Sequence, residues 1–158
     1  MKERNYYGNQ RSNRDDKIMN KKEFWKKMDV AIDNPNVMMA TMEMAALLKQ
    51  AYMDNMGILA QIFYSRERPG IGFQAYIGSQ TERFLICYTS KEQAKKGQAK
   101  NDTWGGDWCE LNVKEVINNL FRKPVIVGLV FNCADEDRMF IVPKEILQEM
   151  IPESIRVN

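Results

Sequence analysis

The amino-acid sequence predicts an α+β fold: a mixed, largely antiparallel sheet of about five strands, with helices packed mainly on one face and one helical crossover. Three observations predict it. The chain has 158 residues, of which 44% are hydrophobic and 28% charged, which is typical of one globular domain. Segments with helical periodicity are interspersed with runs rich in β-branched and aromatic residues. The connection between residues 88 and 125 is long enough for a parallel crossover, while shorter connections favour antiparallel pairs.

Two helices are expected first. Residues 20–23 have the form of a capping box, and the apolar residues after them, at helical spacing, predict a helix that ends before Asn34-Pro35. Residues 37–53 contain no Gly or Pro and predict a second helix, packed against the sheet. Six of the eleven methionines lie between Met38 and Met56. They suit an adaptable partner-binding groove or a core, and core packing is favoured.

After Gly57 the pattern becomes that of strands. Residues 58–64, 72–77 and 83–88 predict a meander of three short strands. Residues 90–93 form another capping box and begin a helix that Gly97 is expected to close, and residues 98–109 then predict a polar loop.

The last third predicts a helix, two strands and a helix. Asn112 and Glu115 cap a helix that Pro124 ends. The nearly unbroken apolar run 125–131 predicts a strand covered on both faces, and residues 139–142 return beside it after an acidic turn. Pro143 is expected as the first residue of a closing helix through Met150.

The net charge of +2 hides an asymmetry. Residues 1–28 hold nine basic and four acidic side chains, and the rest of the chain carries a net charge of −3. Residues 1–19 are polar and predict a basic flexible arm before a single α+β domain over residues 20–158. The arm could contact the phosphates and bases of nucleic acid, although its acidic residues dilute the charge and make a solvated tail the favoured interpretation.

The sequence contains no histidine, which excludes Ser/His/Asp and Cys/His nucleophile arrangements and zinc sites that include histidine. The chain has three cysteines, Cys87, Cys109 and Cys133, and no two of them form a Cys-x-x-Cys pair. Neither a disulfide framework nor a four-cysteine zinc site is therefore expected. The acidic run 135–137 predicts a solvated turn rather than a cation site. We therefore expect no catalytic residue, cofactor or metal. The polar N-terminus predicts a cytoplasmic protein that does not enter a membrane.

The candidate partner-binding site is a loop at the end of the predicted polar segment, formed by Trp104, Gly105, Gly106, Asp107 and Trp108. Two tryptophans beside a flexible glycine pair are costly to leave in water, and tryptophan is enriched at binding hot spots. In the competing and favoured interpretation, both rings fold back on the domain as a lid over its core.

Several segments resemble the SseB-like (enhanced serine sensitivity) N-terminal domain family. Residues 84–94 are similar to its element of strand, Thr-Ser and helix. Residues 111–121, 125–132 and 140–147 are similar to its helix, its glycine-containing strand that ends in Asn, and its final strand and helix. The resemblance covers about residues 57–151 and implies a bacterial cytoplasmic protein of this fold, with no defined reaction and no catalytic residues. The basic arm and the tryptophan loop are not assigned to the family.

The leading hypothesis is a non-enzymatic protein-interaction module with an unidentified protein partner, and a homodimer is another expectation. An enzyme acting through a cysteine or carboxylates without histidine is one alternative. It would require Cys109 or Asp107 to be gathered with basic groups. Weak nucleic-acid binding through the arm is the other alternative.

Overall fold

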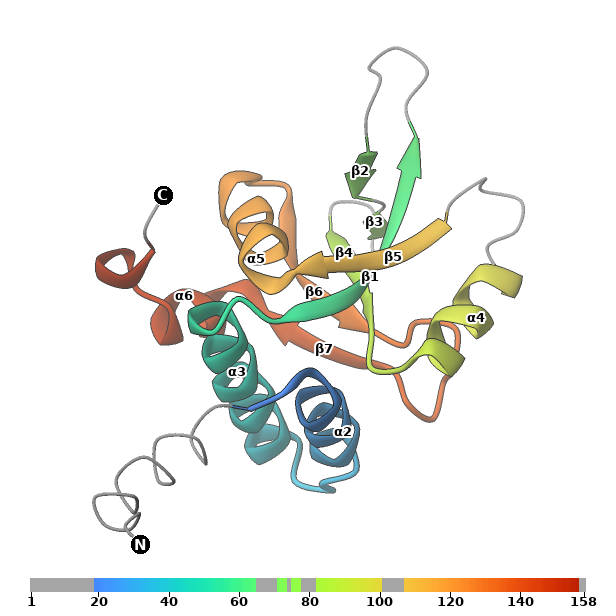
Figure 1. Ribbon diagram of the computed structural model, residues 1–158, viewed down its shortest axis with the longest axis horizontal. Helices are drawn as coiled ribbons and strands as arrows, with labels where there is room; N and C mark the ends of the chain where they lie inside the picture. The colour runs from blue at the N-terminus through green and yellow to red at the C-terminus, as the bar shows by residue number, and fades with distance from the viewer. Residues whose placement is uncertain (1–18, 65–70, 74, 78–81, 101–106, 157–158) are drawn as a thin grey trace, which may run out of the picture.

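The structure is a computed structural model and describes residues 19–64, 71–73, 75–77, 82–100 and 107–156. Its α+β class confirms the predicted one (Figure 1). The elements are, in chain order, α2 (Lys21–Ile32), α3 (Val37–Met53), β1 (Gly57–Tyr64), β2 (Ile71–Phe73), β3 (Ala75–Ile77), β4 (Arg83–Tyr88), α4 (Lys91–Lys100), β5 (Asp107–Asn112), α5 (Val113–Arg122), β6 (Ile126–Phe131), β7 (Phe140–Pro143), α6 (Lys144–Met150) and a short 3-10 helix, Glu153–Ile155.

The sheet is mixed and mostly antiparallel. Leu59 in β1 pairs with Glu110 of β5 on one edge and with Tyr88 of β4 on the other, so the strand order there is β5-β1-β4-β6-β7. Strands β4 and β6 are parallel, whereas β6 and β7 are antiparallel. Short strands β2 and β3 pair with the far end of β1 and the start of β4. The predicted crossover between the parallel strands is confirmed, and it passes through α4, β5 and α5.

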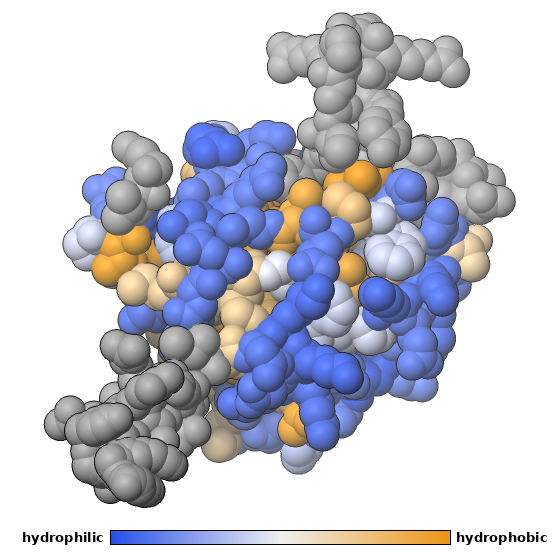
Figure 2. Space-filling view, in the orientation of Figure 1, coloured by the Kyte–Doolittle hydropathy of each residue, from blue (hydrophilic) through white to orange (hydrophobic). Residues whose placement is uncertain are grey.

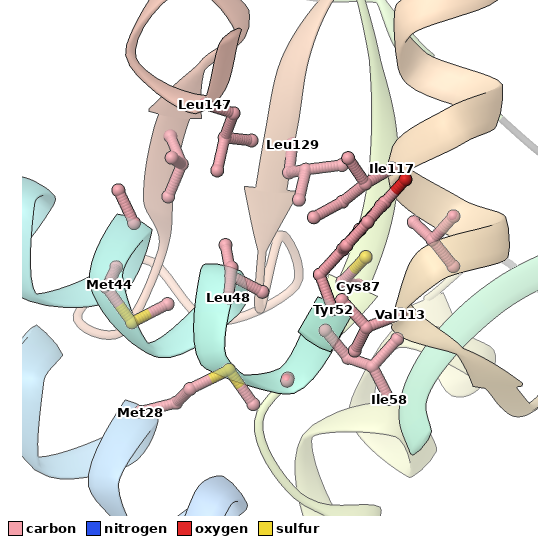
Figure 3. Close-up of a cluster of buried hydrophobic side chains, with 14 of the residues drawn as sticks. Met28, Met44, Leu48, Tyr52, Ile58, Cys87, Val113, Ile117, Leu129 and Leu147 are labelled. Carbon is pink, nitrogen blue, oxygen red and sulfur yellow. The ribbon is translucent and has the colours of Figure 1, made fainter. Parts of the chain in front are cut away.

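Helices lie mainly on one face of the sheet. Helices α3, α5 and α6 pack together over that face, α2 packs along α3, and α4 covers β1 and β4 on the other (Figure 1). Alternation along β4 sends Leu85 and Cys87 into the larger core and Phe84, Ile86 and Tyr88 into the smaller one under α4. The larger core lies between α3, α5 and the sheet, where Met44, Leu48, Tyr52, Ile117 and Leu129 meet (Figure 3).

The predicted N-caps Asn20 and Asn112 are confirmed. The Asn20 side chain accepts a hydrogen bond from the Glu23 amide at 2.9 Å, and the Glu23 carboxylate accepts one from the Asn20 amide, which completes the capping box of α2. The Asn112 side chain caps α5 through the Lys114 amide at 2.8 Å. Pro143 ends β7 and is the N-cap of α6 rather than its first helical residue.

Two further local predictions are wrong. Gly97 does not close α4, which continues to Lys100. A Cβ on Gly97 would lie 2.6 Å from Cε1 of the buried Tyr88 ring, so this glycine allows the close approach of helix and strand. The end of the predicted loop, from Asp107, is instead the edge strand β5. Exposed and half-buried residues do not alternate regularly along β5, so this segment lacks the pattern that predicts a strand. The strand forms because its backbone pairs with β1 over six residues.

The described chain begins within the core. Met19, the last residue of the predicted arm, is 7% exposed and packs in the larger hydrophobic cluster. The rest of the predicted arm, residues 1–18, lies outside the described residues. None of the described helices has the length and apolarity that crossing a bilayer requires.

Candidate functional site

The structure describes two residues of the predicted tryptophan loop, Asp107 and Trp108, while residues 104–106 lie outside the described part. Trp108 is half-buried on β5, and its ring packs against the smaller core. Its indole Nε1 donates to Gln98 Oε1 of α4 at 2.8 Å, and its amide donates to Asp107 Oδ1 at 2.7 Å. Trp108 therefore joins the edge strand to α4.

The three cysteines are free, and each has a raised pKa. Burial raises the pKa of Cys87 to about 12, with a smaller contribution from Cys133. Partial burial raises the pKa of Cys109, and the nearby Asp107 and Glu115 carboxylates raise it further. A nucleophilic cysteine needs a lowered pKa, and the charged groups that act on Cys109 are acids rather than the basic groups that the enzyme hypothesis requires.

The acidic run 135–137 forms a turn, as predicted, and its first carboxylate is held by the domain. Asp135 accepts hydrogen bonds from Gln93 Nε2 at 2.9 Å and from Lys96 Nζ at 3.1 Å. These bonds lower the pKa of Asp135 from its ordinary value. Within the described residues, no three His, Cys, Asp or Glu side chains converge in a way that could hold a metal ion.

A polar network that was not predicted lies at the carboxyl ends of the parallel strands β4 and β6. Thr89 follows β4 and Asn132 follows β6, and parallel pairing brings these two buried residues together. Asn132 Oδ1 accepts from the Thr89 amide at 3.1 Å, and its Nδ2 donates to Thr89 Oγ1 at 3.1 Å and to the Arg138 carbonyl at 3.3 Å. Asn132 has a φ of 56°, a left-handed conformation that asparagine tolerates better than most residues.

Helix α2 is tied to this network by ionic contacts. Thr89 Oγ1 donates to Asp29 Oδ1 at 3.0 Å, and the Arg138 guanidinium binds the same carboxylate at 2.6 Å. Arg138 also pairs with Asp33 just beyond the helix. The network therefore holds one side of α2 above the ends of β4 and β6. The only signals in the sequence were the polar residues that directly follow the two strands.

An open pocket of about 510 Å³ lies beside the network, between α2 and the start of α4. A half-buried tryptophan, Trp25, forms part of its wall, and its Nε1 donates to the Gly57 carbonyl at 3.0 Å. Most of the other lining residues are basic or polar: Lys21, Lys22, Lys26, Asp29, Thr89, Ser90 and Lys91. We call this the lysine pocket.

A larger groove of about 770 Å³ lies between α2 and α3. It is lined by Met19, Glu23, Lys26, Lys27, Val30, Glu43, Ala46, Leu47 and Gln50. The space-filling view shows apolar colour over α3 beside the hydrophilic side chains of α2 (Figure 2). We call this the α2–α3 groove.

The favoured prediction for the methionine cluster, core packing, is wrong for four of its six members. Met44 and Met56 are buried, but Met38, Met39, Met42 and Met53 are 76%, 58%, 47% and 51% exposed. Their positions explain this, because the buried residues of α3 share one side of the helix and these four methionines lie outside it.

No family model, curated protein or solved structure matches the chain. The resemblance to the SseB-like N-terminal domain family therefore stays a prediction from its motifs. The described surfaces offer two chemically distinct arrangements, an apolar helix face beside a groove and a cationic pocket at the strand ends.

Proposed function

We propose that this protein is a non-enzymatic protein-interaction module of the SseB-like type that works in the cytoplasm and binds an amphipathic helix of a partner protein along α3. One observation carries the proposal: four methionines project from the outer side of α3, where Glu43, Lys49 and Gln50 are the polar residues. The inner side, with Met44, Leu48 and Ala51, already belongs to the core. Several large apolar side chains exposed together on one helix favour a second partner.

The exposed side has the form of a docking stripe. Met39, Ala46 and Met53 are seven residues apart and share one face of α3, and Met42 lies next to them. This stripe borders the α2–α3 groove, in which Ala46 and Leu47 belong to the lining. At 1.5 Å per residue, α3 is about 25 Å long, enough for four turns of a bound helix.

Charges beside the groove indicate the chemistry of the bound helix. Lys26, Lys27 and Glu23 lie on the α2 side of the groove, where Glu23 is held in the capping box of α2, and Glu43 lies on the α3 side. A helix with an apolar stripe, acidic residues toward α2 and a basic residue toward Glu43 would complement both sides. Thioether side chains are flexible and polarisable, which suits them to packing against such a stripe. A second copy of this chain is the competing occupant.

The test begins with a photo-crosslinking amino acid at position 42, and the same amino acid at exposed position 95 on α4 serves as control. A lysate of the cells that make the protein supplies the partner. Mass spectrometry identifies the crosslinked segment, and a synthetic peptide of that segment is titrated into protein carrying ¹³C-methyl methionine. We expect the methyl signals of Met38, Met39, Met42 and Met53 to shift, with the buried Met28 and Met44 as internal references.

Two variants separate docking from folding. Met39→Glu with Met42→Glu should weaken peptide binding at least tenfold, because burial of one methionine contributes about 1.5–3 kcal/mol. Lys95→Glu with Lys100→Glu, on α4, should leave binding unchanged. Crosslinking only to a second copy, with a dimer in analytical ultracentrifugation, would make the protein a homodimer instead. Crosslinks at position 42 that do not exceed those at position 95 would remove α3 from the proposal.

A further inference from the structure

The lysine pocket lies where the chain leaves two neighbouring parallel strands in different directions. After β4 the chain enters α4, which packs on β1 and β4, on the side of the sheet that leads to β5. After β6 it turns the other way, to the edge strand β7. In sheets with parallel strands, ligands bind preferentially at the carboxyl ends where successive connections diverge. Thr89 and Ser90, directly after β4, belong to the lining of this pocket.

The charge of the pocket is strongly positive. Four lysines line it against one acid, Asp29, and that carboxylate is already bound by Arg138 at 2.6 Å. Lys21 pairs with Glu110 at 3.0 Å. Among the residues that the structure describes, no carboxylate lies within 4 Å of the ammonium groups of the other three, Lys22, Lys26 and Lys91.

Three of these lysines occupy positions where they reduce helix stability. Lys21 and Lys22 are the first two residues of α2, and Lys91 is the first residue of α4. The positive end of the helix dipole disfavours a cation there. Each of these first turns also holds one acid, Glu23 or Glu92, but neither acid lines the pocket. Two helix starts and three lysines therefore place positive potential at one pocket, which an anion would stabilise.

The pocket also provides donors and an apolar wall. The Ser90 side chain caps α4 through the Gln93 amide at 3.2 Å, and the first-turn amides of Lys91 and Glu92 have no acceptor within the helix. The hydrogen bond from Trp25 to Gly57 fixes the indole ring, and Lys21 lies 5.5 Å from the ring centroid. An anionic group beside Lys22 and Lys91 would thus have a rigid aromatic ring close to it.

We propose that the lysine pocket binds a small phosphorylated metabolite, with its phosphate group between Lys22, Lys91 and the start of α4 and its organic part against Trp25. A volume of about 510 Å³ accommodates a molecule of this size. A phosphate monoester carries up to two negative charges, which matches lysines that no carboxylate of the described residues pairs with. This site is separate from the methionine stripe on α3 and does not depend on the proposed protein-interaction function.

The test follows backbone and indole N–H signals by NMR during titrations with ribose 5-phosphate and adenosine 5′-monophosphate. Ribose, adenosine and inorganic sulfate are the comparison compounds. We expect saturable shifts of the Trp25 indole and the Lys91 amide with the two phosphates. Ribose and adenosine should produce none, and sulfate should bind at least tenfold more weakly.

Matched variants test the role of the lysines. Lys22→Gln with Lys91→Gln should weaken phosphate binding at least tenfold, whereas Lys95→Gln with Lys123→Gln removes the same charge elsewhere and should have little effect. The first pair should also leave the melting temperature unchanged or raise it, because both lysines oppose a helix dipole.

Four results would overturn the proposal. Binding of sulfate as tight as that of the phosphates would indicate an adventitious ion only. Equal losses in both lysine pairs, or no saturable shifts at millimolar phosphate, would remove the pocket as a specific site. Tighter binding of a single-stranded oligonucleotide through the same two lysines would make nucleic acid the ligand instead.

Discussion

Replacement of Asn132 by alanine should lower the free energy of unfolding by about 2–5 kcal/mol. Asn132 is fully buried, and its amide satisfies the Thr89 N–H and the Arg138 carbonyl. A buried polar group left without a partner costs about 1–3 kcal/mol. The φ of 56° adds a penalty of about 1–2 kcal/mol for alanine, which lacks the local hydrogen bonds of asparagine.

Glycine at the same position separates these two contributions. Asn132→Gly loses the same hydrogen bonds but adopts a positive φ without strain. It should therefore be about 1 kcal/mol more stable than Asn132→Ala, the reverse of the order in a helix. Asn55 provides a control, because it has the same φ of 56° on an exposed turn, so Asn55→Ala should lose only the conformational contribution.

Urea unfolding monitored by circular dichroism measures these differences, provided that the m-value is unchanged. A loss of less than about 1 kcal/mol for Asn132→Ala would contradict this expectation, since leaving two groups unpaired must cost more than that. A glycine variant no more stable than the alanine variant would contradict it as well. Either result would mean that the network at the strand ends does not hold its loops in place.

Three further predictions concern other parts of the fold. Gly97→Ala should lower the free energy of unfolding in urea, because the added methyl group meets the buried Tyr88 ring. This is expected although alanine is the better helix former by about 1 kcal/mol. A stabilised variant would contradict it. Cys87, with a pKa raised to about 12 by burial, should react with a thiol reagent at pH 8 only after unfolding, so rapid labelling of Cys87 in the native state would disprove its burial. The hydrogen bond from Gln93 is the main cause of the lowered pKa of Asp135, so the carboxylate contributes stability above pH 3.8 and loses this contribution as the pH falls further. Asp135→Asn should therefore flatten the dependence of the unfolding free energy on pH between about pH 5 and 2. An unchanged dependence would contradict this.

The sequence alone determined the α+β class, the positions of the helices and most of the sheet. Local chemistry was sufficient there: the caps at Asn20 and Asn112 bond to amides three and two residues away, and the apolar run 126–131 is long enough to need cover on both faces. The same local rules failed at Gly97 and over β5, because in both places a distant segment decides the outcome.

Which side chains are exposed, and which distant residues meet, depends on how the elements pack against one another. The composition of α3 suggests a buried helix, and whether Met39 or Met44 faces the core depends on where α5, α6 and the sheet lie. Likewise, Thr89 joins Asn132, 43 residues away, and Asp29, 60 residues away, only because two parallel strands end side by side beneath α2. Contacts of this kind leave no local periodicity in the chain, since they arise from packing between elements rather than within them.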